Sequence, residues 1–385
     1  MSTSLPANSA MYDNITAVTD DLLKYKIGIS QIPGIGSILA KKLIAYTGSI
    51  EAVFKEKKKN LLKIPGIGTS LAEVIVNSQN LEKAEAEIEF IKKYEIKYYF
   101  YLEENYPFRL KQCTDAPIML FSKGHADFNK EKIISIVGTR NATEYGKDFC
   151  SRFVSEMAAR HSDLIIVSGL AYGIDIAAHR AALKNNVTTI AVLAHGLSTL
   201  YPSAHRNSAK EIVNNGALVT DFTSDITPER NNFVKRNRII AGLADATIVV
   251  ESGLKGGALI TADLANSYNR DVFAYPGKST DEWSRGCNKL IKTNKAAMLE
   301  SVEDLEYIMG WDVAKSEPKQ MTLFHNLTEE EQQIVNLLTE ENNLMIDILC
   351  LRADQPVSKI SPLLLKLEFM GLIKSLPGKV YRLIN

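Results

Sequence analysis

The feature that most restricts the fold of this chain is a series of short apolar runs, each separated from the next by a segment with a helical pattern. The runs cover residues 132–137, 163–168, 188–194, 217–221, 246–251 and 271–276. Continuous apolar strands that alternate with amphipathic helices indicate a parallel sheet with helices on both faces. The sequence therefore predicts an α/β fold with a doubly wound, mostly parallel sheet.

Glycine and polar residues follow the carboxyl ends of several of these runs, where ligands bind in sheets of this type. Because glycine has no Cβ, it lets backbone N–H groups approach a phosphate at the start of a helix. One such turn is weak evidence, whereas several on one edge of a sheet predict a pocket for an anion. The residues that we expect to line this pocket are Gly138, Thr139, Arg140, Ser168, Gly169, Gly256 and Gly257.

The net charge of the chain limits the kinds of anion binding that are possible here. The 385 residues include 45 Lys and Arg and 45 Asp and Glu, so the net charge is near zero. A protein that coats nucleic acid over its whole surface would be strongly basic. The neutral balance excludes that class and leaves binding at a local cluster of cations or at backbone groups.

One local cluster places three cations within four residues: Lys235, Arg236 and Arg238, beside Asn237. On a helix, Lys235 and Arg238 share one face. We expect these two side chains to line the same rim as Arg140 and to bind a phosphodiester chain there.

The neighbours of the cluster suggest further roles. Phe233 is placed to stack a base, an interaction that tolerates any sequence. Arg236 is expected to point away from the rim, either into solvent or into a salt bridge with Asp225 or Glu229.

An internal repeat precedes the α/β region. Pro-Gly-Ile-Gly occurs at 33–36 and again at 65–68, each time between two segments of helical pattern. The repeat resembles the helix-hairpin-helix motif, two copies of which pack as one all-α domain and bind nucleic-acid phosphates without reading sequence. It predicts phosphate contacts by at least one hairpin, with helix packing alone as the alternative. The candidate contacts are Gly34, Ile35, Gly36, Gly66, Ile67 and Gly68.

The last part of the chain predicts a small winged-helix domain. Thr328 is a good helix N-cap followed by three acids, and two further helices and a hairpin with its turn at 377–379 complete the pattern. From Thr328 onward there are 8 acids and 6 bases, and the expected recognition helix contains no arginine. We therefore expect this domain to contact a protein rather than to read an operator sequence. The predicted domains are a tandem helix-hairpin-helix domain at 1–95, an α/β core at 96–310, a linker at 311–327 and the winged helix at 328–385.

Motifs that would indicate an enzyme or a metal site are absent from the sequence. There is no GxxxxGK[ST], GxGxxG or GxSxG motif, and the histidines and four cysteines lack metal-ligand spacing. His179 follows Asp175 by one helical turn, which permits either a base with its orienting carboxylate or, more commonly, a hydrogen bond that fixes the loop. We expect no catalytic residue, no metal and no cofactor. No run reaches 18 apolar residues, so the sequence predicts a cytoplasmic protein without membrane contact.

Longer motifs in the α/β region are similar to those of a known family. The segments IVGTRNATEYG, IVSGLAYGIDIAAHRAAL, NNFVKRNRIIAGLADATIVVES and VFAYPGKSTDEWSRGCNKLI occur in this order. Over roughly 105–300, the chain resembles the DNA-processing protein A family, also called DprA or Smf. The resemblance implies a Rossmann-like core that binds single-stranded DNA, forms a homodimer through that core and loads the RecA recombinase during natural transformation and DNA recombination. It also implies that the protein is not an enzyme.

The resemblance extends to individual motifs. The family's Gly-Ser-Arg is Gly138-Thr139-Arg140 here, and its Arg-Asn-Arg is Arg236-Asn237-Arg238. The resemblance therefore implies that Arg236 and Asn237 also belong to the DNA-binding site. Its Ser-Gly-Ser is Gly256-Gly257-Ala258, which has lost two hydroxyls and leaves backbone N–H groups as the contacts of that loop.

Two other functions compete with this one. A nucleotide phosphoribohydrolase of the related lysine-decarboxylase-like fold would use Arg238 and Glu251 as catalytic residues, but its Pro-Gly-Gly-x-Gly-Thr signature is absent. A transcription factor would read DNA with the winged helix, which the acidic balance of that domain disfavours.

Overall fold

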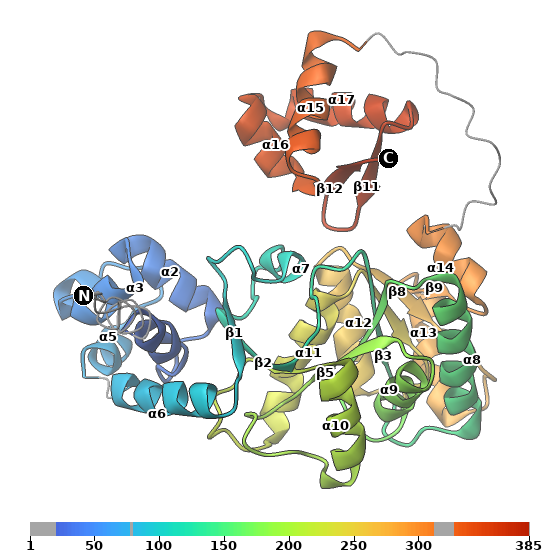
Figure 1. Cartoon of the computed structure of the whole chain (residues 1–385), viewed down its shortest axis with the longest axis horizontal. Helices are drawn as coiled ribbons and strands as arrows, with labels where there is room; N and C mark the ends of the chain where they lie inside the picture. Colours follow the sequence, from blue (N-terminus) through green and yellow to red (C-terminus); the bar gives the residue numbers. More distant parts are fainter. Residues whose placement is uncertain (1–20, 78–79, 312–326, 385) are drawn as a thin grey trace, which may run out of the picture.

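The computed structural model describes residues 21–77, 80–311 and 327–384. An all-helical N-terminal unit, an α/β core and a small C-terminal unit follow one another along the chain (Figure 1). The predicted fold class is confirmed. The predicted linker at 311–327 lies almost entirely outside the described residues. No helix within the described ranges is long and apolar enough to cross a membrane.

The N-terminal unit contains the two predicted hairpins, packed against each other. Gly34 (φ 81°) and Gly66 (φ 96°) take the left-handed backbone conformation that favours glycine. A Cβ on Gly34 would lie 3.3 Å from Leu71, and one on Gly66 would lie 3.5 Å from Leu39, so each turn packs on the other hairpin. The elements are helical residues 21–30, α2 (Ser37–Thr47), α3 (Ile50–Lys55), α4 (Lys58–Leu61), α5 (Thr69–Val76) and α6 (Asn80–Lys93).

The core is built on a nine-stranded sheet with the order β1-β2-β6-β5-β4-β3-β7-β8-β9. Neighbours from β6 to β9 in this order are parallel, and β1 and β2 add an antiparallel edge. The six predicted strands are present as β3 to β8, whereas the sequence pattern does not predict β1, β2 or β9. The strands are β1 (Lys97–Phe100), β2 (Met119–Gly124), β3 (Lys132–Val137), β4 (Leu164–Ser168), β5 (Thr188–Val192), β6 (Gly216–Thr220), β7 (Ala246–Val249), β8 (Asp271–Ala274) and β9 (Ala297–Met298).

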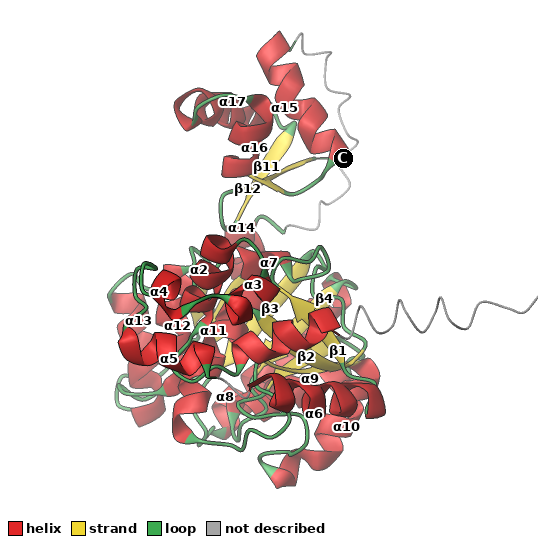
Figure 2. Cartoon of the chain, turned by 90° about the vertical axis from the view of Figure 1, so that its left-hand side faces the viewer, coloured by secondary structure: helices red, strands yellow, loops and turns green. Residues whose placement is uncertain are grey.

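Helices cover both faces of this sheet, as the continuous apolar strands predict (Figure 2). One apolar core joins the sheet to α7, α11, α12 and α13, and a second joins its other face to α8, α9 and α14. The core helices are α7 (Phe108–Lys111), α8 (Glu144–Arg160), α9 (Ile174–Lys184), α10 (Arg206–Asn215), α11 (Arg230–Leu243), α12 (Gly257–Ser267), α13 (Arg285–Lys292) and α14 (Val302–Met309).

The strand order reverses in the middle of the sheet. From β3 the chain adds β4, β5 and β6 on one side, and it then crosses to add β7, β8 and β9 on the other. The loops that follow β3 and β7 therefore diverge and leave a crevice at the carboxyl ends of these strands. The fold places its natural ligand site there.

The N-terminal unit is fixed to the antiparallel edge of the sheet. Its apolar core is continuous with Phe100 of β1 and Phe121 of β2. The carboxylate of Glu87 on α6 accepts hydrogen bonds from the backbone N–H (2.9 Å) and hydroxyl (2.6 Å) of Ser224 in the core. These contacts hold the hairpins in one position relative to the core.

The C-terminal unit has the predicted winged-helix pattern and its own apolar core. Thr328 caps its first helix through a reciprocal capping box with Glu331. Its elements are α15 (Glu329–Glu340), β10 (Leu344–Met345), α16 (Ile346–Ala353), α17 (Val357–Phe369), β11 (Ile373–Leu376) and β12 (Val380–Leu383).

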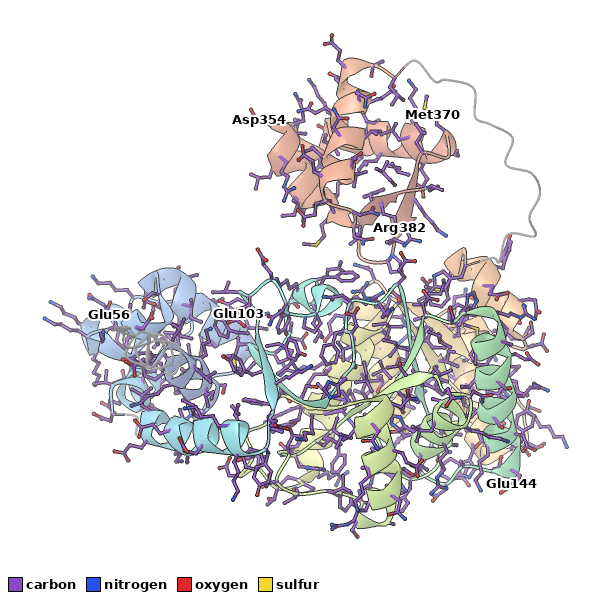
Figure 3. All side chains as sticks on the ribbon, viewed as in Figure 1. Glu56, Glu103, Glu144, Asp354, Met370 and Arg382 are labelled. Carbon is purple, nitrogen blue, oxygen red and sulfur yellow. The ribbon has the colours of Figure 1, made fainter. Side chains whose placement is uncertain are left out.

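The β11–β12 hairpin of this unit contacts the core. Arg382 forms a salt bridge with Glu131 (3.2 Å), and Figure 3 shows Arg382 on the side that faces the core. The guanidinium of Arg270 donates to the carbonyl of Pro377 (3.1 Å), and Lys374 donates to the carbonyl of Gly310. Glu131 and Arg270 immediately precede β3 and β8, so the hairpin sits at the amino-terminal edge of the sheet.

Candidate functional site

A cavity of about 800 Å³ opens at the carboxyl ends of β3 and β7, where the strand order reverses. We call it the switch-point pocket. The loops after β3, β4 and β7 and the first turns of α11 and α12 form its walls. Its lining includes Val137, Gly138, Thr139, Arg140, Ala171, Asp175, Tyr201, Arg230, Phe233, Val234, Arg236, Asn237, Ser252, Lys255, Gly256, Gly257, Ile260, Thr261 and Trp283.

Positive charge predominates in this pocket. Four cationic side chains line it, namely Arg140, Arg230, Arg236 and Lys255, against the single carboxylate of Asp175. Arg140, Arg230 and Lys255 are exposed, and none of them forms a salt bridge with any residue that the structure describes. A neutral protein thus concentrates uncompensated positive charge in one concave site, which suits an anionic ligand.

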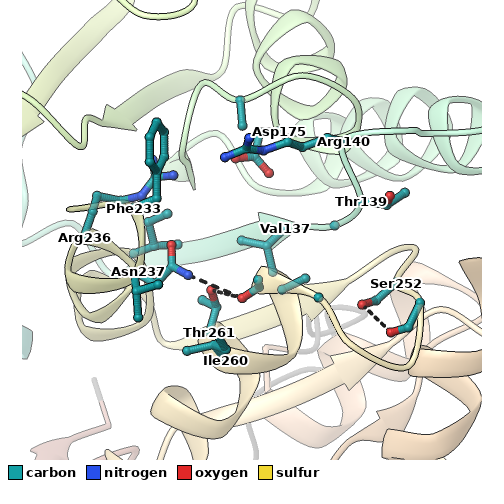
Figure 4. A pocket seen from close by; sticks show the side chains of 18 of the residues that line it. Val137, Thr139, Arg140, Asp175, Phe233, Arg236, Asn237, Ser252, Ile260 and Thr261 are labelled. Atoms are coloured by element: carbon teal, nitrogen blue, oxygen red, sulfur yellow. Dashed lines mark hydrogen bonds between the residues drawn. The ribbon is translucent and has the colours of Figure 1, made fainter. Parts of the chain in front are cut away.

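Phe233 lies between two of these cations (Figure 4). The guanidinium carbon of Arg140 lies 5.0 Å from the centre of its ring, and that of Arg236 lies 6.0 Å away. Tyr201 meets the same ring edge-on, with 5.7 Å between the ring centres. The pocket therefore offers an aromatic surface within reach of cations, an arrangement that suits a base and its phosphate.

Arg236 contradicts the expectation that it points into solvent or pairs with Asp225 or Glu229. Its side chain is buried, and it donates hydrogen bonds to the carbonyls of Gly169 (2.7 Å) and Val192. A Cβ on Gly169 would lie 2.2 Å from the Arg236 guanidinium, so any side chain there would displace that guanidinium. Burial lowers the pKa of Arg236 to about 10, which leaves it charged at neutral pH.

Asp175 lies beside Arg140 and belongs to α9 (Figure 4). Burial raises the pKa of its carboxyl, and the nearby Arg236 acts in the opposite direction. His179, one turn later, bonds to the Thr189 hydroxyl (2.7 Å), and no Asp175–His179 hydrogen bond is present among the described residues. Burial also lowers the pKa of His179 to about 3, so it is neutral. The pairing of His179 as a base with Asp175 as its orienting carboxylate is therefore not found. The Asp175 carboxylate instead accepts hydrogen bonds from the backbone N–H groups of Gly169 and Ala171, which fix the loop before α9.

The remaining wall is the start of α12. Gly256 is its N-cap and Gly257 its first residue, and both line the pocket as expected. The side-chain amide of Asn237 donates to the carbonyl of Gly257 (3.3 Å), which ties α11 to α12 (Figure 4). The first N–H groups of an eleven-residue helix lack intrahelical partners and add to the attraction for an anion.

A second cavity of about 470 Å³ lies between the first hairpin and the core. We call it the hairpin–core groove. Lys235 and Arg238 line this groove and not the switch-point pocket, so the expectation that they share a rim with Arg140 is wrong. The (i, i+3) spacing correctly puts both on one face of α11, but that face is turned toward the hairpin.

Arg238 has partners on several elements. Its guanidinium forms a salt bridge with Asp221 (2.6 Å), donates to the carbonyl of Asp115 and donates to the Ser37 hydroxyl (3.3 Å). The carboxylate of Glu251 is also engaged, since it accepts from the backbone N–H (2.9 Å) and hydroxyl of Thr143 at the start of α8. These contacts give both residues structural roles, and Glu251 lines neither cavity.

Several other predicted site residues lie outside the pocket. Ser168 is fully buried, and its hydroxyl donates to the carbonyl of Ile136 (2.6 Å). The carbonyl of Gly169 accepts the bond from Arg236, and its N–H bonds to the Asp175 carboxylate. In the hairpins, the side chains of Ile35 and Ile67 are core residues. Their N–H groups donate to Ile32 (3.1 Å) and Ile64 (3.0 Å) within the turns, so these amides are occupied.

The structure adds lining residues that the motifs do not indicate. Arg230, Lys255, Tyr201 and Trp283 all line the switch-point pocket. Arg230 and Lys255 have a signal in the sequence, because each directly precedes a predicted helix beside a motif already identified. Tyr201 and Trp283 come from loops whose course the sequence pattern does not indicate.

The chain matches known protein families along most of its length. The family model described as DNA recombination-mediator protein A matches residues 97–309, the DprA winged helix domain matches 318–379, and the SAM-like helix-hairpin-helix tandem matches 27–78. Protein Smf of Escherichia coli (strain K12) is 36% identical over 73% of this chain and 75% of its own length.

Solved structures of DNA processing protein A are among those that resemble the chain. DNA processing protein A (DprA) from Streptococcus pneumoniae matches with a TM-score of 0.60 and 31% identity, over 74% of this chain and 97% of that chain. DNA processing protein A from Helicobacter pylori, described for its unique single-stranded DNA binding mode, matches with a TM-score of 0.50 and 28% identity, over 56% of this chain and 97% of that chain.

Proposed function

Because the chain belongs to the DNA recombination-mediator protein A family, we propose that it binds single-stranded DNA without sequence preference in the switch-point pocket and loads the strand with a RecA recombinase. Natural transformation and DNA recombination are the processes in which such an activity is used. The observation that carries the proposal is the composition of the pocket. Four cations face one carboxylate around an aromatic ring, at the edge of the sheet where this fold binds ligands.

Each group in the pocket has a role in this proposal. Arg140, Arg230 and Lys255 contact phosphates from the exposed rim, and Arg236 fixes the floor and the orientation of Phe233. Phe233 stacks a base. Gly138 and Thr139, together with Gly256 and Gly257, let the backbone approach the strand. None of these contacts depends on the identity of the base, so binding tolerates any sequence.

Binding through these cations should depend steeply on salt. If Arg140, Arg230 and Lys255 each neutralise one phosphate, log K falls with log salt with a slope of about −2, at ~0.7 per phosphate of a single strand. Fluorescence anisotropy of a labelled oligo-dT measures this slope between low and physiological salt. A flat response, or equal affinity for an uncharged oligonucleotide analogue, would contradict the electrostatic basis of the proposal.

The second step of the proposal is transfer of the strand to RecA. We expect the chain to accelerate RecA assembly on single-stranded DNA that is already covered by a single-stranded-DNA-binding protein. RecA-dependent ATP hydrolysis on that DNA reports assembly, and its lag should shorten when the chain is added. An unchanged lag at every ratio of the chain to RecA, together with normal DNA binding, would restrict the function to binding alone.

The competing hydrolase has no comparable support. Arg238 and Glu251, its expected catalytic pair, are held by Asp221 and by Thr143 respectively. Release of free base from a nucleoside monophosphate by the purified chain would favour it. Homodimer formation through the α/β core and a cytoplasmic location stay predictions from the family resemblance.

The winged-helix domain is proposed to bind a protein. Its helix α17 exposes apolar side chains, with Leu365 54% and Phe369 84% accessible, and contains no arginine. A helix of this composition suits an apolar protein surface better than the edges of base pairs.

A further inference from the structure

We propose that the hairpin–core groove binds a nucleotide of the same strand, next to the nucleotides held in the switch-point pocket. This inference rests on the proposed function and extends it to a second site, one wall of which belongs to the first hairpin. The switch-point pocket alone would hold the strand on the core. The groove extends that path onto the N-terminal domain.

The two cavities are neighbours that share a wall. Val234 on α11 and Ile260 on α12 line both of them. Both side chains are partly exposed, Val234 at 49% and Ile260 at 40%, so they form a low apolar ridge between the cavities. A strand that leaves the pocket over this ridge enters the groove directly.

The chemistry of the groove differs from that of the pocket and suits a base. Arg238 is neutralised by Asp221, and Asp115 accepts a hydrogen bond from the Tyr268 hydroxyl (2.6 Å). The half-buried ring of Phe222 offers a surface against which a base packs. Apolar side chains form most of the lining, and besides the shared ridge they include Ile35, Ile118, Met119 and Leu264.

Lys235 supplies the charge for the accompanying phosphate. It is exposed at the edge of the groove, and among the described residues it has no salt-bridge partner. Because it follows Val234 on α11, it lies at the point where a strand would cross the ridge. One cation beside an apolar groove matches one phosphate beside one base.

Asp221 provides a second, independent indication. Its side chain is only 9% exposed, and one carboxylate oxygen accepts the bond from Arg238. The other oxygen, Oδ1, has no hydrogen-bond partner in the part of the chain that is described. A buried acceptor left unpaired costs about 1–3 kcal/mol. Every DNA base carries at least one N–H donor on its pairing edge, and a base in the groove brings such a donor next to Asp221, which lines it.

The groove exists before a ligand arrives. Ser37 at the start of α2 accepts a bond from Arg238 (3.3 Å), and Lys26 forms a salt bridge with Glu103 of the core (2.5 Å). Together with the apolar core shared by the hairpins and β1–β2, these contacts fix the wall that the hairpin contributes. A preformed wall avoids the entropy of ordering a segment when the strand binds.

The test fills the groove from the hairpin side. Gly36 lines the groove, has an ordinary backbone conformation (φ −84°) and has no atom within 4 Å of an added Cβ. We expect Gly36→Trp to weaken binding of an oligo-dT of about 20 nucleotides roughly 10-fold, the value of one stacked base. Ser70→Trp on the second hairpin is the control, because Ser70 is exposed and outside the groove; it should bind like the unmodified chain.

A second experiment identifies the base. An abasic residue is moved along the oligonucleotide, and the unmodified chain should lose affinity most strongly at two separate regions, one for each cavity. In Gly36→Trp the loss at one of these regions should disappear, since the groove is already filled. Lys235→Ala gives an independent test that leaves the hairpin intact, and it should weaken binding of the same oligonucleotide several-fold.

The outcomes separate this inference from the proposed function. Unchanged affinity in both Gly36→Trp and Lys235→Ala, with melting temperatures equal to that of the unmodified chain, would overturn the inference and leave the pocket as the DNA site. No binding of any oligonucleotide by the unmodified chain would overturn the proposed function itself.

Discussion

Replacement of Arg140 by glutamate is expected to weaken binding of single-stranded DNA about 100-fold at about 0.1 M salt, equivalent to ~2.7 kcal/mol. Arg140 is exposed, and no carboxylate among the described residues forms a salt bridge with it. The substitution removes a charged contact to a phosphate and places a second carboxylate beside Asp175. Both changes weaken binding at the point where the other two exposed cations, Arg230 and Lys255, contact the strand.

The control for this variant has the same change of net charge at a different place. Arg180 on α9 is also exposed, forms no salt bridge within the described chain and lines neither cavity. Arg180→Glu should change affinity less than about 3-fold, because exposed charges are screened within about 10 Å at 0.1 M salt. Anisotropy titrations measure the affinity of both variants, and thermal melting confirms that they fold. Equal losses would mean that overall charge, and not the pocket, controls binding.

Asp245→Ala is expected to cause the largest loss of stability, about 3–5 kcal/mol in the free energy of unfolding. The carboxylate of Asp245 accepts two bonds from Arg109, at 2.6 and 2.9 Å, and one from the N–H of Ile133 at 2.9 Å. The Arg109 side chain is only 2% exposed, so the substitution leaves a buried charge without its partner. This pair joins α7 to the amino ends of β3 and β7.

Urea denaturation followed by circular dichroism measures this loss at constant m-value. Asp263→Ala serves as the control, because Asp263 pairs with Lys295 at the surface, with side chains 57% and 54% exposed. Exposed pairs contribute about 0–1 kcal/mol, so the stability of the control should remain close to that of the unmodified chain. A loss below about 1 kcal/mol for Asp245→Ala would show that water enters and solvates Arg109, contrary to its burial.

The parts of the fold that repeat a simple pattern could be predicted from the sequence. The six parallel strands are almost entirely apolar because both their faces are covered, whereas a strand with one face in water would show a polar residue at every second position. The antiparallel strands β1 and β2 lack such a pattern, since β1 has four residues of which only one is buried, and burial in β2 stops before its last two residues. Their place in the sheet depends on pairing with β6, which local sequence does not indicate.

The candidate site likewise combines residues whose positions the sequence predicts with a helix whose orientation it does not predict. The positions of Gly138, Arg140 and Gly257 follow from strand ends, because all carboxyl ends of a parallel sheet meet at one edge. The orientation of α11 does not follow from its own sequence. Helical spacing correctly groups Lys235 with Arg238, but whether that face or the face of Arg236 meets the pocket is decided by packing against β4 and β5. The carbonyl of Gly169, which follows β4, and that of Val192, the last residue of β5, accept the hydrogen bonds of Arg236.

The β11–β12 hairpin of the winged-helix domain rests on the amino-terminal edge of the sheet, whereas the switch-point pocket opens at the carboxyl-terminal edge. A strand that enters the pocket therefore leaves the contacts of Arg382 and Arg270 undisturbed. DNA at one edge of the sheet and the winged-helix domain at the other do not overlap in space. One molecule can therefore hold DNA and a protein bound to α17 at the same time. Under the proposed function, the chain therefore brings a partner to the DNA without releasing either of them.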